Sequence, residues 1–91
     1  MRPAISVIIP AYNNKIYMKD CLDSVISQNF KDFEIVVCDD HSNDGTYDIL
    51  LQYQREHNNI RVLRNSKNMG VTPARHRAIV ESNGKHITTL D

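Results

Sequence analysis

The side chains best suited to chemistry stand directly after short apolar segments of the chain. Tyr12 follows the first segment, the neighbouring acids Asp39 and Asp40 follow the second, and Asp91 follows the last. A tyrosine ring offers a flat face on which a base can stack, and a carboxylate at Asp40 can accept the N–H of a uracil-type ring. A final carboxylate suits a divalent cation. This combination predicts a site for a nucleotide and a metal ion.

Two of these residues, Asp39 and Tyr12, also admit a purely structural interpretation. Adjacent carboxylates repel each other, so they are seldom placed together without a cation, a donor or a ligand. Yet Asp39, together with Ser42 and Asp44, has the spacing of ordinary turns and helix caps. For Tyr12, the alternative is a loop tyrosine that lies over the edge of a sheet. We expect a capping role for Asp39 and a ligand contact for Asp40.

The segment from Gly70 to Arg75 has the composition of a helix start that binds phosphate. Thr72 is placed to be the N-cap and Pro73 the first helical residue, where its missing N–H is of no consequence. Free backbone N–H groups at such a start favour phosphate oxygens. Because the helix dipole disfavours a guanidinium there, we expect Arg75 to neutralise a diphosphate. Arg77 is expected on the surface.

The pattern of apolar residues predicts alternating strands and helices that position these groups. Residues 4–9 form a β-branched run closed by Pro10, and either Asn13 or Asn14 can cap the helix that follows. That helix has one apolar stripe, formed by Met18, Cys21, Leu22, Val25 and Ile26. The remaining predicted elements are a strand at 33–38, a helix at 46–57, a strand at 60–64, a helix at 72–83 and a strand at 85–90.

The alternation of strand and helix favours an α/β fold, with a Rossmann-like, mainly parallel sheet and helices on both faces. In such sheets, ligands bind beyond the carboxyl ends of the strands. The loops at 10–14, 39–42 and 65–70, together with Asp91, are therefore expected to meet at one site.

Bulk properties restrict the class of protein. The 91 residues, 41% of them hydrophobic, suffice for one small core. Eleven basic and eleven acidic residues cancel, which argues against a nucleic-acid partner. Cys21 and Cys38 lack the spacing of a disulfide framework or a zinc site, and the sequence shows neither a signal peptide nor a membrane-spanning run. A cytoplasmic protein is expected.

Missing motifs exclude other enzyme classes. With only three glycines, the sequence has neither the dinucleotide-binding G-x-G-x-x-G nor a P-loop. The G-x-S-x-G and H-E-x-x-H motifs do not occur either. The four histidines lack metal-ligand spacing and are expected in loops or on the surface.

Five blocks of the sequence resemble the N-terminal half of family 2 glycosyltransferases with the GT-A fold. In chain order they are SVIIPAYN (6–13), SVISQ (24–28), FEIVVCDDHSNDGT (33–46), NMGVTPAR (68–75) and ITTLD (87–91). The blocks extend over nearly the whole chain in the family's order and spacing. His41, Asn43 and Met69 depart from the residues frequent in the family, but none of them removes an expected contact.

The resemblance implies that residues 1–91 are the nucleotide-binding part of a glycosyltransferase domain, truncated at the first acid of an Asp-x-Asp motif. Such an enzyme would transfer sugar with inversion from a nucleotide-sugar donor, commonly a UDP-sugar. The acceptor would be a hydroxyl of a saccharide or a lipid-linked acceptor, in bacterial cell-envelope polysaccharide synthesis. The implied nucleotide-binding residues are Pro10, Ala11, Tyr12, Asn14, Asp40, Gly70, Arg75 and Asp91. The implied cofactor is Mn²⁺ or Mg²⁺, bound by Asp91.

The resemblance also places the catalytic base beyond Asp91. No residue of this chain is therefore assigned to catalysis, and the isolated chain is expected to be inactive. Association with the inner face of a membrane would need segments beyond Asp91.

Two alternatives to a glycosyltransferase remain open. One is a receiver-like signalling domain, since Asp39 and Asp40 are similar to the acidic pair of such domains, although Arg64 and Asn65 stand where its phosphoacceptor belongs. The other is a non-catalytic interaction module, which predicts no affinity for nucleotides.

Overall fold

The computed structural model of the protein describes residues 2–90, so Asp91, the predicted metal ligand, lies outside the described residues. The elements in chain order are β1 (Ile5–Ala11), α1 (Lys15–Ile26), β2 (Phe33–Asp39), α2 (Thr46–Glu56), β3 (Ile60–Arg64), α3 (Val71–Glu81) and β4 (His86–Thr89). Within residues 2–90, no helix has the length and apolar character needed to cross a membrane.

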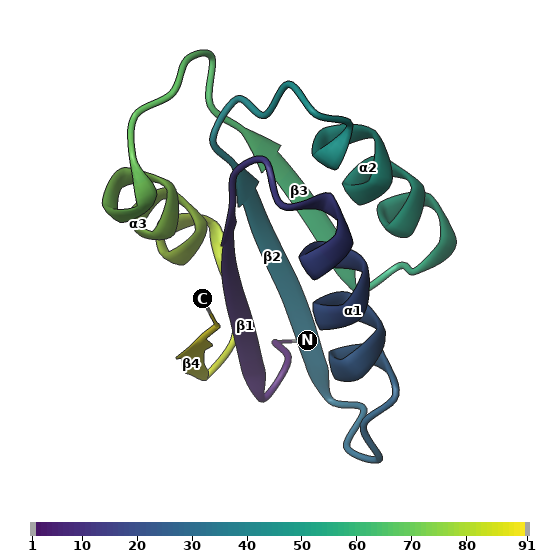
Figure 1. The fold of residues 1–91 in the computed structure, drawn as a ribbon. Coiled ribbons are helices and arrows are strands. Elements are labelled where there is room, and N and C mark those ends of the chain that lie inside the picture. The colour runs from purple at the N-terminus through teal and green to yellow at the C-terminus, as the bar shows by residue number, and fades with distance from the viewer. Residues whose placement is uncertain (1, 91) are drawn as a thin grey trace.

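The strands of this part of the chain form one parallel sheet in the order β3-β2-β1-β4 (Figure 1). β1 lies inside the sheet and pairs with β2 along its whole length, from Ile5 opposite Phe33 to Ala11 opposite Asp39. The predicted α/β fold with a parallel sheet is confirmed. The chain runs outward from β1 to β2 and β3 and then returns to place β4 on the other side of β1. Such a reversal of strand order is where open α/β sheets bind ligands.

Different helices cover the two faces of the sheet (Figure 1). Successive strand residues point to opposite faces, so the odd-numbered and even-numbered residues of β1 and β2 enter separate clusters. α1 and α2 cover the odd-numbered side, where Val7, Ile9, Ile35 and Val37 pack with Met18, Leu22 and Leu50. α3 covers the other side, where Ala74 and Ala78 pack with Ile8, Val36 and Cys38. The small side chains of α3 let this helix lie close to the sheet, beside the end of β1.

Pro10 lies inside β1, whereas the sequence predicts that it closes the strand. The N–H of Leu90 donates to the carbonyl of Ile8, and backbone groups two residues apart face the same side of a strand. The nitrogen of Pro10 therefore faces the β4 side, where the described pairing ends at Ile8 opposite Thr89. A proline is tolerated there because its missing N–H has no ladder partner to lose.

α3 also begins earlier than predicted, at Val71 with Gly70 as its N-cap, so the assignment of Thr72 as the N-cap is wrong. Gly70 has φ +103°, a left-handed conformation that glycine adopts without strain, and this turn brings the chain into the helix sooner. Pro73 becomes the third helical residue. It is still in the first turn, where backbone N–H groups have no intrahelical partner.

Candidate nucleotide-binding site

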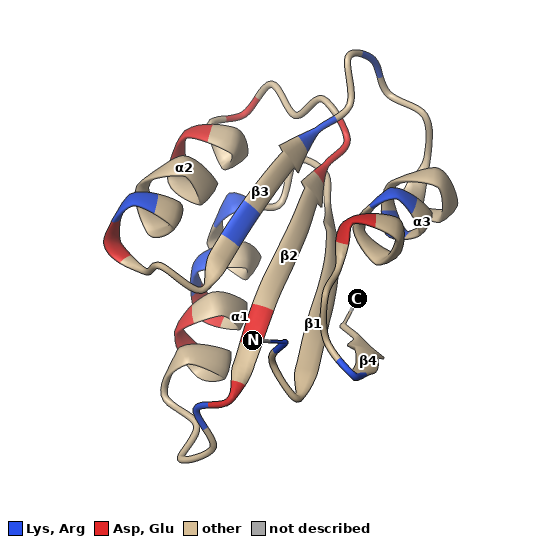
Figure 2. Ribbon diagram, turned by 180° about the vertical axis from the view of Figure 1, so that it is seen from behind, with Lys and Arg blue, Asp and Glu red and all other residues tan. Residues whose placement is uncertain are grey.

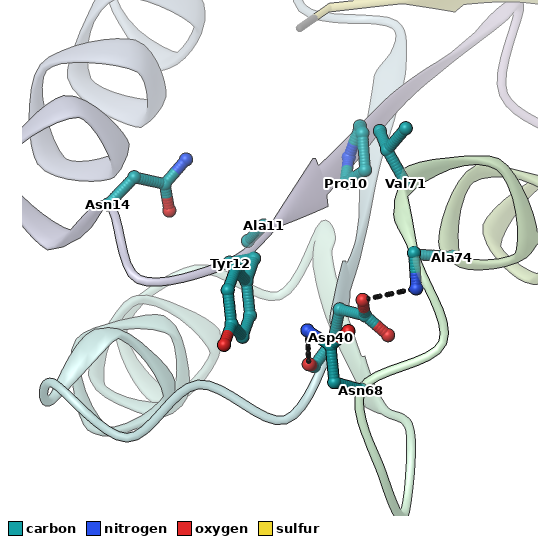
Figure 3. Close-up of a pocket in the computed structure, with 9 residues that line it drawn as sticks. Pro10, Ala11, Tyr12, Asn14, Asp40, Asn68, Val71 and Ala74 are labelled. Atoms are coloured by element: carbon teal, nitrogen blue, oxygen red, sulfur yellow. Dashed lines mark hydrogen bonds between the residues drawn. The ribbon is translucent and has the colours of Figure 1, made fainter.

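A pocket of about 400 Å³ lies where the carboxyl ends of β1 and β2 meet the start of α3 (Figure 3). Its walls come from three loops and the first turns of α3. The lining residues are Pro10, Ala11, Tyr12, Asn14, Asp40, Asn68, Gly70, Val71 and Ala74. The structure thus brings together most of the residues that the sequence assigned to nucleotide binding, namely Pro10, Ala11, Tyr12, Asn14, Asp40 and Gly70.

Tyr12 forms one wall of the pocket. It is the first residue after β1, its side chain is 47% exposed, and Figure 3 shows its ring beside the same opening as Asp40. An exposed aromatic ring at the mouth of an apolar pocket is an arrangement on which a flat heterocycle can stack. The stacking role of Tyr12 stays a prediction.

Asp40 fastens the loop between β3 and α3 to the end of β2. Its side chain is only 3% exposed. Oδ1 accepts hydrogen bonds from the side-chain amide of Asn65 and from the backbone N–H of Met69, each at 2.9 Å. Oδ2 accepts one from the N–H of Gly70 at 2.7 Å. Burial alone would raise the pKa of Asp40, but these three hydrogen bonds, together with a smaller electrostatic contribution from His41, outweigh it and hold the pKa below the ordinary value of 3.8.

These contacts correct one sequence prediction. The N–H groups before α3 were expected to be free for phosphate oxygens, but the carboxylate of Asp40 already occupies the N–H groups of Met69 and Gly70. The helix start does bind an anion, and that anion is a side chain of the same chain. A carboxylate oxygen can accept about two hydrogen bonds, so Oδ2, which accepts only one of the three described here, keeps one acceptor position.

The capping role expected for Asp39 is wrong, because α2 has Gly45 as its N-cap and Asp39 closes a turn instead. It is fully buried, and its two oxygens accept hydrogen bonds from the hydroxyl and the N–H of Ser42 at 2.6 and 2.9 Å. The neighbouring acids therefore serve different loops. Asp39 closes the turn after β2, and Asp40 reaches across to the loop before α3.

Arg75 is partly buried and is not among the residues that line the pocket. Its proposed contact with a diphosphate stays a prediction.

Arg77 was expected to be only a surface residue. It is exposed, but it donates to the carbonyl of Arg64 at 2.6 Å and to the side-chain oxygen of Asn65 at 3.1 Å. It thereby supports the same Asn65 that binds Asp40.

Three residues of the pocket were not assigned from the sequence: Asn68, Val71 and Ala74. Val71 and Ala74 are three residues apart, so they lie on one side of the first turn of α3. The sequence shows this spacing, but it indicates a shared helix face only if the helix begins at Val71. Asn68 stands two residues before the glycine of the turn, and its amide lies 3.5 Å from the carbonyl of Asp40.

Asn14 occupies the N-cap position of α1, as expected, but its side chain makes no capping hydrogen bond. Its Oδ1 atom is buried without a hydrogen-bond partner among the described residues. An unsatisfied acceptor in a pocket wall suits a ligand hydroxyl.

No metal-binding group of three or more His, Cys, Asp or Glu side chains is found among residues 2–90. Asp40 is the carboxylate that lines the pocket, and three protein donors already hold it. It is therefore unsuited to be the main ligand of a divalent cation.

Sequence comparison finds the family model described as glycosyl transferase family 2 over residues 6–91. Among curated proteins, the putative teichuronic acid biosynthesis glycosyltransferase TuaG of Bacillus subtilis is 38% identical over 90 residues. The match extends over 99% of this chain and 36% of TuaG.

Solved structures with the same fold contain bound nucleotides. S. aureus TarS 1-349 in complex with UDP matches all of this chain with a TM-score of 0.89 and 33% identity. The mannosyltransferase PcManGT from Pyrobaculum calidifontis, in complex with GDP-Man and Mn²⁺, matches 98% of it with a TM-score of 0.85 and 25% identity. This chain corresponds to 27% and 28% of those two chains. It thus spans about a third or less of the relatives it matches.

Proposed function

Because the chain belongs to glycosyl transferase family 2, we propose that its pocket binds the nucleotide of a sugar-nucleotide donor and that this nucleotide is UDP. The observation that carries the proposal is the placement of Tyr12 and Asp40 on one pocket of about 400 Å³. A uracil ring has flat faces and a single N–H donor between two carbonyl groups. Tyr12 supplies the stacking surface, and Oδ2 of Asp40 supplies the acceptor. The likeness to TarS in complex with UDP supports the same choice.

The hydrogen bonds of Asp40 favour uracil over guanine. Guanine presents two neighbouring donors, a ring N–H and an amino group, and both oxygens of a carboxylate are needed to accept them. Oδ1 of Asp40 already accepts two hydrogen bonds, from Asn65 and Met69. One acceptor position remains on Oδ2, which matches the single donor of uracil.

The complete reaction proposed for the whole enzyme is transfer of sugar, with inversion, to a hydroxyl of a saccharide or a lipid-linked acceptor. The likeness to TuaG, named for teichuronic acid biosynthesis, supports a role in making a cell-envelope polymer. The 91 residues contribute the nucleotide site. The base that takes the proton of the acceptor hydroxyl is assigned to none of them, so we expect this chain alone to show no turnover. A cytoplasmic location stays a prediction.

A divalent cation belongs to the proposed reaction and is assigned to Asp91. A carboxylate oxygen has the ligand chemistry that Mn²⁺ and Mg²⁺ prefer, and the engaged Asp40 does not offer it. When bound, such a cation stabilises negative charge on the departing diphosphate. The presence of Mn²⁺ in the PcManGT complex supports the use of a divalent cation.

The alternative of a receiver-like signalling domain lacks its reactive group. β3 ends at Arg64 and is followed by Asn65, so the place of the phosphoacceptor holds no carboxylate. The alternative of a non-catalytic module differs from our proposal in one measurable property, which is affinity for UDP.

Calorimetric titration of the 91-residue chain with UDP tests the proposal. We expect binding of UDP, weaker binding of GDP, and loss of UDP binding in Asp40→Asn. Asp20→Asn is the matched control, because Asp20 is an exposed acid on α1 outside the pocket. Equal affinity for UDP and GDP contradicts the choice of base, and absence of any nucleotide binding favours the non-catalytic module.

A further inference from the structure

The orientation of Tyr12 depends on the residue that follows it. Asn13 has φ +48°, in the left-handed region that residues other than glycine seldom adopt. The chain reverses at this point, between the end of β1 and the start of α1. The contacts that hold Asn13 in this conformation therefore also hold the adjoining backbone that carries Tyr12.

Two hydrogen bonds hold Asn13, and both come from the loop after β2. The N–H of Asn13 donates to Oγ of Ser42 at 2.9 Å, and Oδ1 of Asn13 accepts from the N–H of Asn43 at 2.9 Å. The turn that presents Tyr12 is thus attached to a loop from the neighbouring strand.

In its contact with Asn13, the hydroxyl of Ser42 can only accept a hydrogen bond. It carries a single proton, and that proton is donated to Oδ1 of Asp39 at 2.6 Å. Its lone pairs are then left to accept from Asn13. Asp39 is fully buried and also accepts from the N–H of Ser42. Its carboxylate therefore fixes the position of the Ser42 hydroxyl and the direction in which that hydroxyl donates its proton.

The buried charge of Asp39 is balanced from β3. Nε of Arg64 lies 3.5 Å from Oδ2 of Asp39, and the same guanidinium donates to the carbonyl of Ser42 at 2.9 Å. It also lies over the ring of Tyr47, 4.3 Å from the ring centre. Figure 2 shows this basic end of β3 next to the acidic end of β2. A continuous series of contacts therefore leads from Arg64 through Asp39, Ser42 and Asn13 to Tyr12.

We propose that Ser42 and Asp39 are positioning residues that hold the ring of Tyr12 in the orientation in which it stacks on the base. This inference rests on the proposed function. It assigns a second task to the acidic pair: Asp40 meets the base, and Asp39 arranges the opposite wall through Ser42. Neither Asp39 nor Ser42 lines the pocket itself, so both act through Asn13 and Tyr12.

A double-mutant cycle distinguishes positioning from simple attachment of two loops. UDP affinity is measured by calorimetry for the wild-type chain, Ser42→Ala, Tyr12→Ala and the double variant. We expect Ser42→Ala to weaken binding about three- to tenfold, which is the range of one hydrogen bond. In the Tyr12→Ala background, the same change should have no further effect, because the ring that Ser42 positions is gone.

Ser6→Ala is the matched control for loss of a buried hydroxyl. Ser6 is also fully buried; its hydroxyl donates to Glu34 at 2.5 Å and accepts from the N–H of Gly84 at 2.7 Å. It lies near the start of β1, about 20 Å along the strand from Tyr12. We expect Ser6→Ala to lower the unfolding temperature as Ser42→Ala does, but to leave UDP affinity within twofold.

The outcomes separate the two proposals. If the wild-type chain does not bind UDP, the proposed function fails. The positioning role is then tested by the NMR signals of the Tyr12 ring, which Ser42→Ala should change more than Ser6→Ala does. If Tyr12→Ala weakens binding but Ser42→Ala does not, or if the two losses multiply in the double variant, the positioning role is wrong. Should Ser42→Ala not fold, Asn13→Gly replaces it, because glycine tolerates the positive φ and removes only the contact with Asn43.

Discussion

The two ends of the sheet contain similar polar groups but use them differently. At the carboxyl ends of the strands, Asp39 and Asp40 hold three loops around a pocket of about 400 Å³. At the amino ends, Glu34 and Ser6 accept the N–H groups of Asn83 and Gly84 and join the entry to β4 to the sheet. Both networks pair a carboxylate with a buried serine hydroxyl.

The two networks differ in the cavity beside each of them and in the polar groups that line it. The amino-end groove is larger, about 820 Å³, but side chains of both charge signs line it, including Arg2, Arg61 and Glu34. Both arginines donate to backbone carbonyls, those of residues 81, 83 and 84, although Nε of Arg61 has no hydrogen-bond partner among the described residues. The carboxyl-end pocket is smaller but has apolar walls, an exposed ring and a carboxylate with an acceptor position left. Apolar walls with a few convergent polar groups therefore identify the ligand site better than volume does.

The largest effect is expected from Gly84→Ala at the amino end. A Cβ atom at this position would lie 2.4 Å from Oγ and 2.5 Å from the backbone N of Ser6, and 2.9 Å from the carbonyl carbon of Ile5. Since backbone atoms cannot yield as a side chain can, we expect a loss of about 3 kcal/mol in the free energy of unfolding. Urea unfolding followed by circular dichroism measures it.

Gly45→Ala is the control for this substitution. A Cβ there meets only the flexible side chain of Lys15, at 3.7 Å, but Gly45 has φ +96°. The expected loss is about 1 to 2 kcal/mol, from backbone strain alone. A larger loss in Gly45→Ala than in Gly84→Ala would show that the amino end is not closely packed.

At the carboxyl end, Asp40→Asn should destabilise the chain by about 1 to 3 kcal/mol, because an amide cannot accept all the hydrogen bonds that the carboxylate accepts. Glu34→Gln is the matched change at the amino end. We expect it to lower stability without affecting UDP affinity, whereas Asp40→Asn lowers both. If both variants keep their affinity, the Asp40 network is only structural.

Asp40 also makes the free energy of unfolding depend on pH in the acidic range. Its pKa in the folded chain lies below the ordinary value of 3.8. Its contribution is therefore complete well above pH 3.8 and is lost as the pH falls through the folded pKa. Acid titration of the unfolding free energy should be less steep below about pH 4 in Asp40→Asn than in the wild-type chain. Equal slopes would mean that the hydrogen bonds to Asp40 do not stabilise its charged form.

Tyr12→Ala should change binding but hardly change stability, since its ring is 47% exposed. Loss of one stacking contact with a base is expected to weaken UDP binding by about 1 to 3 kcal/mol. Phe30→Ala is the control, because Phe30 is 53% exposed in the loop after α1, outside the pocket. Similar UDP affinities in the two variants would refute the stacking role.

The smallest effect is expected between the two ends, at the contact of α1 with α2. Burial and the hydrogen bond to Asp23, at 2.6 Å, raise the pKa of Tyr53 to about 12. The folded state thus favours the neutral phenol, and the stabilisation is complete below about pH 10 and is lost as the pH rises through 12. Tyr53→Phe should make alkaline unfolding less steep between these values, while UDP affinity stays unchanged. An unchanged alkaline slope would mean that the bond to Asp23 is not maintained in solution.

Most of the fold was predictable because local patterns agree with the tertiary structure. Each apolar run that predicted a strand forms one, and the stripe with Met18 and Leu22 is the buried face of α1. The errors lie at element boundaries. Pro10 is tolerated within β1 because it lies beyond Ile8, where the pairing with β4 described for residues 2–90 ends, and α3 begins at Val71 because Gly70 turns the chain earlier. The first depends on β4, which is distant in sequence, and the second involves Asp40, thirty residues before Gly70, whose carboxylate accepts the N–H of Gly70.

The sequence by itself determined the parallel α/β sheet, the family and the loops that carry the site, since periodicity and residue type are local properties. Only the tertiary structure decided the tasks of the individual polar groups. Asp39 and Asp40 are adjacent in the chain, yet one arranges the turn beside Tyr12 and the other occupies the N–H groups of Met69 and Gly70. The physical reason is that a hydrogen bond depends on distance and direction between atoms, and parallel strands bring these atoms together from loops that are about thirty residues apart.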